Sequence, residues 1–195
     1  MSEIKILVEG YAKPTGGDSY KASPTSILIK DSGKIILVDP GASRQKLLNA
    51  LKKEGLETED IDIIFLTHYH PDHLLNIKLF DNVDIYDGST VYRDDEEFEY
   101  SGNIPGTNIQ VVSTPGHAYE HVSLLVNTKE GKMCVAGDLW WWMDGAKQKI
   151  DTESLLSLKD PFAKDKKALL KSRKKILSMA DIIIPGHGKM FRVGK

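Results

Sequence analysis

The chain has 195 residues, of which 41% are hydrophobic and 28% are charged, and its formal net charge is −2. This length suits a single domain over residues 1–195 with its own core, and the charge excludes a global positive field for nucleic acid or anionic membranes. A single cysteine, no visible signal peptide and no run of about 18 apolar residues together predict a cytoplasmic protein that does not enter a membrane.

Short apolar runs separated by turn residues predict a series of strands. They cover residues 4–8, 25–29, 35–39, 61–66, 83–86, 109–113, 122–127, 133–136 and 182–185. Two helices are expected: one from Ser43, a plausible N-cap, to Lys53, and one over residues 165–179. A shorter helix is expected after His73. Hairpins mixed with strand–helix–strand passages predict a layered α/β (α+β) domain. Residues 11–23, 87–107 and 140–161 are expected to stay irregular.

The six histidines are grouped rather than scattered. They lie in three short clusters: His68, His70 and His73; His117 and His121; and His187. Imidazoles clustered at tight spacing are what metal sites require.

The strongest motif, Thr67-His68-Tyr69-His70-Pro71-Asp72-His73, directly follows an apolar strand. His68 and His70 are two residues apart, so in an extended segment their rings project to one side. Pro71 disfavours the helical region for His70 and stiffens the turn, after which Asp72 and His73 come round to a neighbouring position. One loop can therefore supply ligands to two ions that lie close together.

Three further loops each place one ligand-type residue after an apolar strand and a tight Gly or Pro turn. These residues are His117 in Pro115-Gly116-His117, Asp138 in Gly137-Asp138 and His187 in Pro185-Gly186-His187-Gly188. Glycine lets the backbone pass close to an ion. Strand-end loops that present His and Asp together predict a catalytic metal site with open coordination positions.

These four motifs, in this order, resemble the metallo-β-lactamase superfamily over nearly the whole chain. The resemblance implies a four-layer αββα sandwich of two mixed sheets flanked by helices, with the site along one edge of the sheets. It also implies a dinuclear metal centre, with Asp39 as a supporting residue behind the ligands. The implied ligands are His68, His70 and His117 for the first metal, and Asp72, His73 and His187 for the second, with Asp138 bridging.

The activity implied by this resemblance is metal-assisted hydrolysis. Two divalent ions would hold a bridging water as hydroxide, with Asp72 or Asp138 orienting the water or passing on its proton. Zinc is the expected metal, with iron or manganese as alternatives. Residues 159–161, Arg173 and the stretch 185–193 are most similar to a short group within the superfamily, metallo-β-lactamase domain-containing protein 1.

Three substrate classes follow from the sequence. The first hypothesis is a small ester, thioester or lactone. The alternative is an RNA phosphodiesterase, favoured by the narrower similarity and by the lysine-rich residues 164–175, and opposed by the acidic run 94–97. The second alternative is a mononuclear iron persulfide oxygenase. Antibiotic cleavage is disfavoured, because the commonest antibiotic-cleaving members carry cysteine where this chain has Asp138. A small-molecule partner is expected, and the sequence leaves a homo-oligomer open.

Several other residues have a structural and a functional interpretation. His121 is expected to support the site or lie at the surface rather than to bind metal. Cys134 is expected to be inert core. The consecutive residues Trp140, Trp141 and Trp142 cannot all point inward, so one or two are expected in the core, with the functional alternative that at least one lines the substrate groove. The 164–175 stretch, which includes Arg173, is expected to be a solvated helix face.

Overall fold

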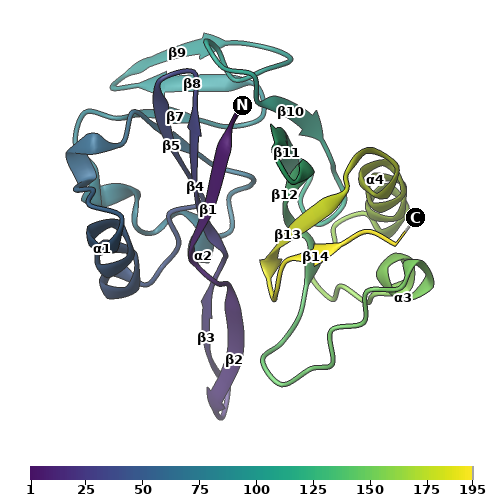
Figure 1. Cartoon of the computed structure of the whole chain (residues 1–195). Helices are drawn as coiled ribbons and strands as arrows, with labels where there is room; N and C mark the ends of the chain where they lie inside the picture. The colour runs from purple at the N-terminus through teal and green to yellow at the C-terminus, as the bar shows by residue number, and fades with distance from the viewer. Residues whose placement is uncertain (195) are drawn as a thin grey trace.

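A computed structural model describes residues 1–194 of the chain. Two mixed sheets face each other, and helices cover their outer faces (Figure 1). The predicted αββα arrangement is therefore confirmed.

The first sheet has seven strands in the order β1-β4-β5-β6-β7-β8-β9. The β5–β6 and β6–β7 pairs are parallel, and the other pairs are antiparallel. The strands are β1 (Glu3–Val8), β4 (Ser26–Asp31), β5 (Lys34–Val38), β6 (Ile63–Phe65), β7 (Asp84–Tyr86), β8 (Thr90–Arg93) and β9 (Glu96–Glu99).

The second sheet has five strands in the order β10-β11-β12-β13-β14, and its β12–β13 pair is parallel. The strands are β10 (Gln110–Ser113), β11 (Val122–Thr128), β12 (Gly131–Trp141), β13 (Ile182–His187) and β14 (Phe191–Arg192). Strands β2 (Tyr11–Gly16) and β3 (Ser19–Ser23) form a separate hairpin that projects beyond the two sheets (Figure 1).

Helix α1 (Arg44–Lys53) lies outside the first sheet, and α3 (Thr152–Ser157) and α4 (Lys166–Met179) lie outside the second (Figure 1). The one-turn α2 (Pro71–Leu74) lies between the sheets at the end that carries the β2–β3 hairpin. Two 3₁₀ turns span Thr58–Asp60 and Ile77–Leu79. Helix α4 begins where Asp165 accepts hydrogen bonds from the backbone of Lys167 and Ala168, a typical N-cap. No helix among residues 1–194 is long and apolar enough to cross a membrane.

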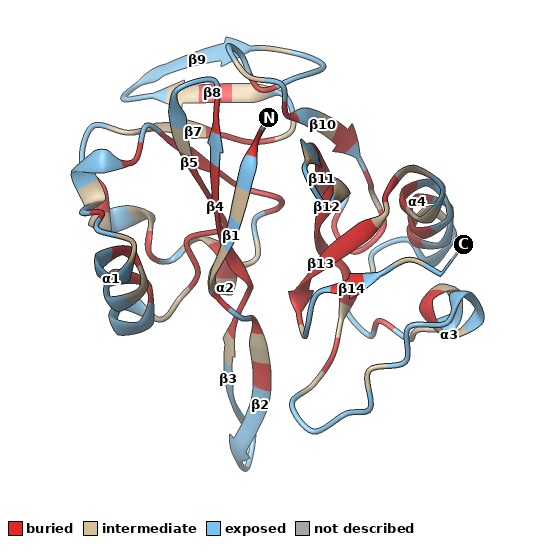
Figure 2. Cartoon of the chain, in the orientation of Figure 1, coloured by how far each residue is buried: buried red, intermediate tan, exposed pale blue. Residues whose placement is uncertain are grey.

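Side chains of the central strands form three hydrophobic cores. Figure 2 shows strands β4 and β13 coloured almost entirely as buried. On β4, Ile27 and Ile29 face the second sheet, whereas Leu28 faces α1. On β12, Val135 faces the first sheet and Cys134 packs toward α4. Successive residues of a strand point to opposite faces. Because these strands are apolar on both faces, one face packs against the other sheet and the opposite face packs against a helix.

The three stretches expected to be irregular contain regular structure, so that prediction was wrong in part. Residues 11–23 form the β2–β3 hairpin, residues 87–107 contain β8 and β9, and residues 140–161 contain the end of β12 and helix α3. Strands β2 and β9 are largely exposed, so backbone hydrogen bonds to their partner strands, rather than burial, hold them in place. Exposed edge strands lack the apolar alternation that makes a strand readable in sequence.

Candidate metal centre

The predicted ligand-type residues meet at one edge of the two sheets, although they come from four separate loops. Within each of two groups, the candidate ligand atoms all lie within 4.8 Å of one another. The seven-residue cluster consists of His68, His70, His117 and Asp138 in one group, and Asp72, His73 and His187 in the other.

Asp138 lies between the two groups. Its Oδ2 is 3.3 Å from His117 Nε2 and 3.9 Å from His68 Nε2. Its Oδ1 is 3.5 Å from His73 Nε2 and 3.7 Å from His187 Nε2. Burial opposes ionisation of this carboxyl, but the surrounding histidines, His187 and His73 foremost, hold its pKa well below the ordinary value. Asp138 can therefore reach both groups as a carboxylate.

Buried polar atoms at the cluster lack hydrogen-bond partners. Among residues 1–194, His68 Nε2, His73 Nε2 and Asp138 Oδ1 are buried and make no hydrogen bond. An unpaired buried polar atom costs about 1–3 kcal/mol, and three that converge on one region need a common partner. Nitrogen and oxygen ligands at this spacing suit a divalent metal. The residues present therefore fit metal ions.

The other ring nitrogen of each of four histidines is already held. His68 Nδ1 donates to Thr67 Oγ1 at 3.0 Å, and His187 Nδ1 donates to the Tyr11 carbonyl at 3.1 Å. His73 and His117 donate from Nδ1 to carboxylates, as described below. This tautomer leaves the Nε2 lone pair directed into the site. Burial lowers the pKa of His68 well below its usual value, which favours the neutral form that binds metal.

Asp39 organises the strand end that carries His68. It accepts hydrogen bonds from Thr67 N at 2.9 Å, Thr67 Oγ1 at 2.8 Å and His73 Nδ1 at 2.8 Å. Its own backbone has φ 48°, a left-handed conformation that is strained for a residue other than glycine. The supporting position inferred for Asp39 by resemblance thus corresponds to direct contacts with Thr67 and His73.

Asp160 was not singled out as a site residue by the sequence, yet it contacts the cluster. Its Oδ2 accepts a 2.7 Å hydrogen bond from His117 Nδ1, and its Oδ1 accepts from Trp141 Nε1 at 3.2 Å and from Phe162 N at 3.0 Å. In the sequence, Asp160 stood out only because residues 159–161 are similar to a short group within the superfamily. A separation of 43 residues from His117 conceals the contact in sequence.

His121 is completely buried and is not a surface residue. Its Nε2 accepts a 3.1 Å hydrogen bond from the Asp138 backbone N–H, and its Nδ1 donates to Thr114 Oγ1 at 2.9 Å. Burial lowers its pKa to about 3, so the ring is neutral. His121 therefore helps to fix the backbone that presents Asp138.

Two glycines allow the chain to pass close to Asp138. A Cβ at Gly186 would lie 1.9 Å from Asp138 Oδ1, and a Cβ at Gly137 would lie 2.6 Å from His121 Nε2. Gly137 also has φ +52°, which disfavours other residues. The glycines in the Gly-Asp and Gly-His motifs are thus required by close packing.

A cavity of about 270 Å³ opens beside the cluster. Besides cluster residues, it is lined by the largely apolar side chains Ala12, Ala22, Pro71, Trp141 and Phe162. The tryptophan run divides as strand alternation requires: Trp140 and Trp142 are buried in the core under α4, and Trp141 lines the cavity.

Two other expectations concern residues outside the cavity. Cys134 is completely buried in the core, as expected. The expectation of a solvated face over residues 164–175 was wrong for Arg173, which is only 2% exposed. Its neighbours Lys174 and Lys175 are exposed. Arg173 lies on the inner face of α4, because helix periodicity separates it from those lysines.

The αββα sandwich, with His and Asp side chains gathered at the edge of its sheets, places this protein in the class of metal-binding α/β enzymes. Comparison with known proteins is consistent with this class. Residues 21–109 match the family model described as the metallo-beta-lactamase superfamily. The metallo-beta-lactamase domain-containing protein 1 of Xenopus laevis is 34% identical over 98% of this chain and 82% of its own length.

Solved structures support the same fold. The Thermotoga maritima protein tm0894 superposes with a TM-score of 0.72 at 18% identity, over 98% of this chain and 99% of its own. AidC, a dizinc quorum-quenching lactonase, gives a TM-score of 0.60 at 19% identity, over 88% and 74%. A di-iron-bound form of TTHA1623 gives 0.59 at 23% identity, over 88% and 90%. The 34% identity to the Xenopus laevis relative over nearly the whole chain shows that the chain belongs to the metallo-β-lactamase superfamily. Its membership and its His/Asp site support a metallohydrolase that binds divalent metal.

Proposed function

We propose that this metallohydrolase acts on a small ester, thioester or lactone. The observation that carries the proposal is the cavity beside the cluster, which is about 270 Å³ in volume and largely apolar away from the ligand-type residues. That volume lies just below the usual range for small-molecule pockets, which is roughly 300–1,000 Å³. A short acyl group fits such a space, whereas several nucleotides do not.

In this proposal the seven-residue cluster holds two divalent metals. His68, His70 and His117 would hold the first, and Asp72, His73 and His187 would hold the second, with Asp138 within reach of both groups. Divalent ions bound there would lower the pKa of water toward neutrality and polarise a carbonyl group. Zinc is the proposed metal, in keeping with the N/O ligand set.

The remaining roles fall to side chains of this chain. Asp72 is the more accessible of the two cluster carboxylates, with 27% of its side chain exposed against 7% for Asp138. Asp72 is therefore the proposed group that passes a proton to solvent, and Asp138 the group that orients the water. Trp141 and Phe162, tilted rings with centroids 5.6 Å apart, would contact the apolar part of the substrate.

An RNA substrate has less support in the cavity. Of the residues that the structure describes, those that line it include no lysine or arginine, and phosphate contacts normally require such cations. The acidic residues 94–97 lie at the β8–β9 turn, at the end of the molecule away from α2 and the β2–β3 hairpin (Figure 1). They therefore do not border the cavity beside the cluster.

The experiment is an activity panel on metal-loaded protein with a short-chain ester, a thioester, a γ-lactone and an RNA oligonucleotide. We expect turnover of at least one acyl substrate, loss after chelation and recovery on adding zinc. Metal analysis should give two ions per chain. One iron per chain with oxygen-dependent persulfide oxidation, or a higher kcat/KM for RNA than for every acyl substrate, would contradict the proposal.

Variants make the test specific to the site. His68→Ala should lower kcat/KM by at least about a hundredfold, because a direct ligand matters no less than its outer partners. Phe162→Ala should raise KM for the longer acyl chains more than for acetyl. The matched control is Phe98→Ala, since Phe98 is similarly exposed but lies on β9. Equal effects of the two phenylalanine substitutions on KM would show that Phe162 does not contact the substrate.

A further inference from the structure

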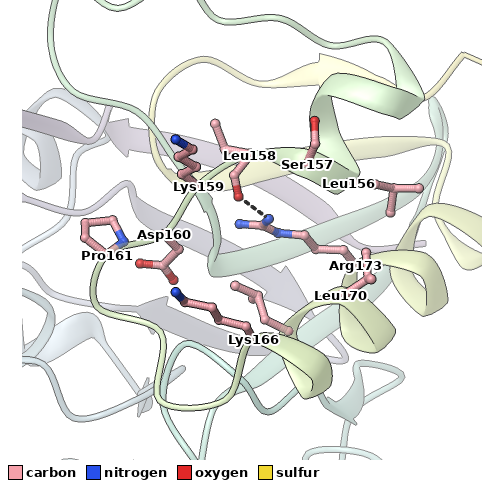
Figure 3. A pocket seen from close by; sticks show the side chains of 10 residues that line it. Leu156, Ser157, Leu158, Lys159, Asp160, Pro161, Lys166, Leu170 and Arg173 are labelled. Carbon is pink, nitrogen blue, oxygen red and sulfur yellow. Dashed lines mark hydrogen bonds between the residues drawn. The ribbon is translucent and has the colours of Figure 1, made fainter.

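A second and larger cavity is lined in part by Asp160, the residue that accepts the hydrogen bond from His117. Its volume is about 660 Å³, and it is an open pocket bordered by the end of α3, the segment 158–161 and the first half of α4 (Figure 3). The apolar part of its lining includes Leu156, Leu158, Leu169 and Leu170. The proposed hydrolytic reaction uses none of these residues.

Arg173 places a buried cation at this cavity. Its Nε donates to the Leu139 carbonyl at 2.7 Å and its Nη1 to the Leu158 carbonyl at 2.6 Å. Its Nη2 is buried and has no hydrogen-bond partner among residues 1–194. Figure 3 shows the guanidinium pointing inward between Lys159, Asp160 and Lys166. Burying a guanidinium that has an unsatisfied N–H donor costs free energy unless an acceptor binds that donor.

The charge of the lining is not balanced. Lys159, Lys166 and Arg173 bring three cations, against one carboxylate, that of Asp160. Both Asp160 oxygens already accept hydrogen bonds from His117, Trp141 and Phe162. No carboxylate of the described residues lies within ion-pair distance of Arg173. Burial lowers the pKa of Arg173 to about 10, which still leaves it charged at neutral pH.

We propose that this cavity is a binding site for a small organic anion, in which a carboxylate or phosphate group is carried on a short apolar body. The oxyanion would be held by Arg173 with Lys159 and Lys166, and the apolar body would lie against the leucines. Arginine matches the planar geometry of carboxylate and phosphate oxygens. The volume falls within the range of small-molecule sites.

A purely structural role explains the contacts of Arg173 Nε and Nη1 but not the buried Nη2, which is unpartnered among the described residues. Nε and Nη1 tie the end of β12 to the segment after α3 through two carbonyls. Nη2 contributes nothing to that link, and Lys159 and Lys166, both exposed at the rim, contribute nothing either. The proposal therefore predicts that the two lysines matter for anion binding and not for folding.

The test measures the thermal midpoint of the metal-loaded protein with sodium phosphate, hexanoate and hexyl phosphate, each against chloride at equal ionic strength. The wild type is compared with the double variant Lys159→Gln/Lys166→Gln and with Lys167→Gln. Lys167 is an exposed neighbour that does not line the cavity, and is the matched control. Arg173 itself is left intact because its two backbone contacts support the fold.

At an anion concentration of about ten times the dissociation constant, we expect at least one anion to raise the midpoint of the wild type and of Lys167→Gln by about 3–6 °C. The double variant should keep its own midpoint in chloride and lose that rise. A greater rise with hexyl phosphate than with inorganic phosphate would support the apolar part of the site. The proposal is overturned if no anion raises the midpoint, or if the rise persists in the double variant. Persistence would place the anion at the metal centre instead.

Discussion

Asp160 and His117, 43 residues apart in the chain, are joined by a 2.7 Å hydrogen bond between a carboxylate and the ring nitrogen that faces away from the cluster. Both side chains are about 99% buried. The same carboxylate accepts from Trp141 and from the Phe162 backbone. One carboxylate thus fixes the orientation of the His117 and Trp141 rings and anchors the backbone of Phe162.

The first prediction concerns Asp160→Asn. The amide has the shape of the carboxylate but only one oxygen that accepts hydrogen bonds. This oxygen can face either His117 or Trp141, so the other residue loses its acceptor. We expect metal affinity to fall about 10- to 100-fold, measured by competition with a chelator of known affinity. Asp165→Asn, at the exposed N-cap of α4, is the control. Unchanged affinity in Asp160→Asn would show that His117 does not need this contact.

The second prediction concerns the buried pair of His121 and the Asp138 backbone. His121→Leu removes the acceptor of the Asp138 N–H and the partner of Thr114. Leaving a buried donor without a partner costs about 1–3 kcal/mol, so the free energy of unfolding should fall by that amount. Urea unfolding of the chelated protein measures it without a contribution from metal. A loss of less than about 0.5 kcal/mol would mean that water replaces the ring.

The third prediction uses the close approach of Gly186 to Asp138. In Gly186→Ala the new methyl group would overlap Asp138 Oδ1, so the carboxylate must move away from the cluster. We expect at least a tenfold loss of metal affinity by calorimetric titration, on the scale of lost supporting contacts. Gly194→Ala, where nothing lies within 4 Å of the added carbon, is the control and should bind as the wild type does. Tight binding in both variants would refute this placement of Asp138.

The fourth prediction concerns stability at acidic pH and lies far from the cluster. Asp31 accepts hydrogen bonds from Ser2 at 2.6 Å, Ser32 at 2.9 Å and the Asn108 backbone at 2.7 Å. Burial opposes its ionisation, but these donors outweigh burial and lower its pKa below the ordinary 3.8. A depressed pKa stabilises the fold above the pKa of the unfolded chain, and this stabilisation is lost as pH falls through the folded-state value.

The matching experiment compares wild type and Asp31→Asn by urea unfolding at pH 7 and near pH 3. The variant should be less stable at pH 7 by about 1–2 kcal/mol, because hydrogen bonds to a charged acceptor are lost. The difference should shrink toward pH 3, which lies below the ordinary pKa of 3.8, because there the unfolded chain binds the proton that the folded carboxylate resists. A difference independent of pH would show that charge plays no part.

The fifth prediction concerns removal of metal. Bound metal stabilises only the folded chain, so chelation should lower the thermal midpoint, and re-addition of zinc should restore it. The buried unpartnered atoms His68 Nε2, His73 Nε2 and Asp138 Oδ1 give the physical reason, since without metal they remain unsatisfied. A midpoint unaffected by both chelator and zinc would indicate that the cluster binds no metal.

The sequence by itself predicted the layered fold and the grouping of the seven-residue cluster. Both signals are local: apolar runs on central strands are buried on both faces, and ligand-type residues follow directly where those strands end. The hairpins β2–β3 and β8–β9 escaped prediction because exposed strands carry no such apolar pattern.

Only the tertiary structure decided which distant residues support the cluster and what lies behind it. Asp160 meets His117 because the segment after α3 packs against the end of β12, where Trp141 also donates to Asp160. Arg173 lies inside a run of lysines in the sequence, but the turn of α4 directs it to the interior. Such contacts depend on how elements pack, and a residue's neighbours in sequence do not encode them when its partner lies many residues away.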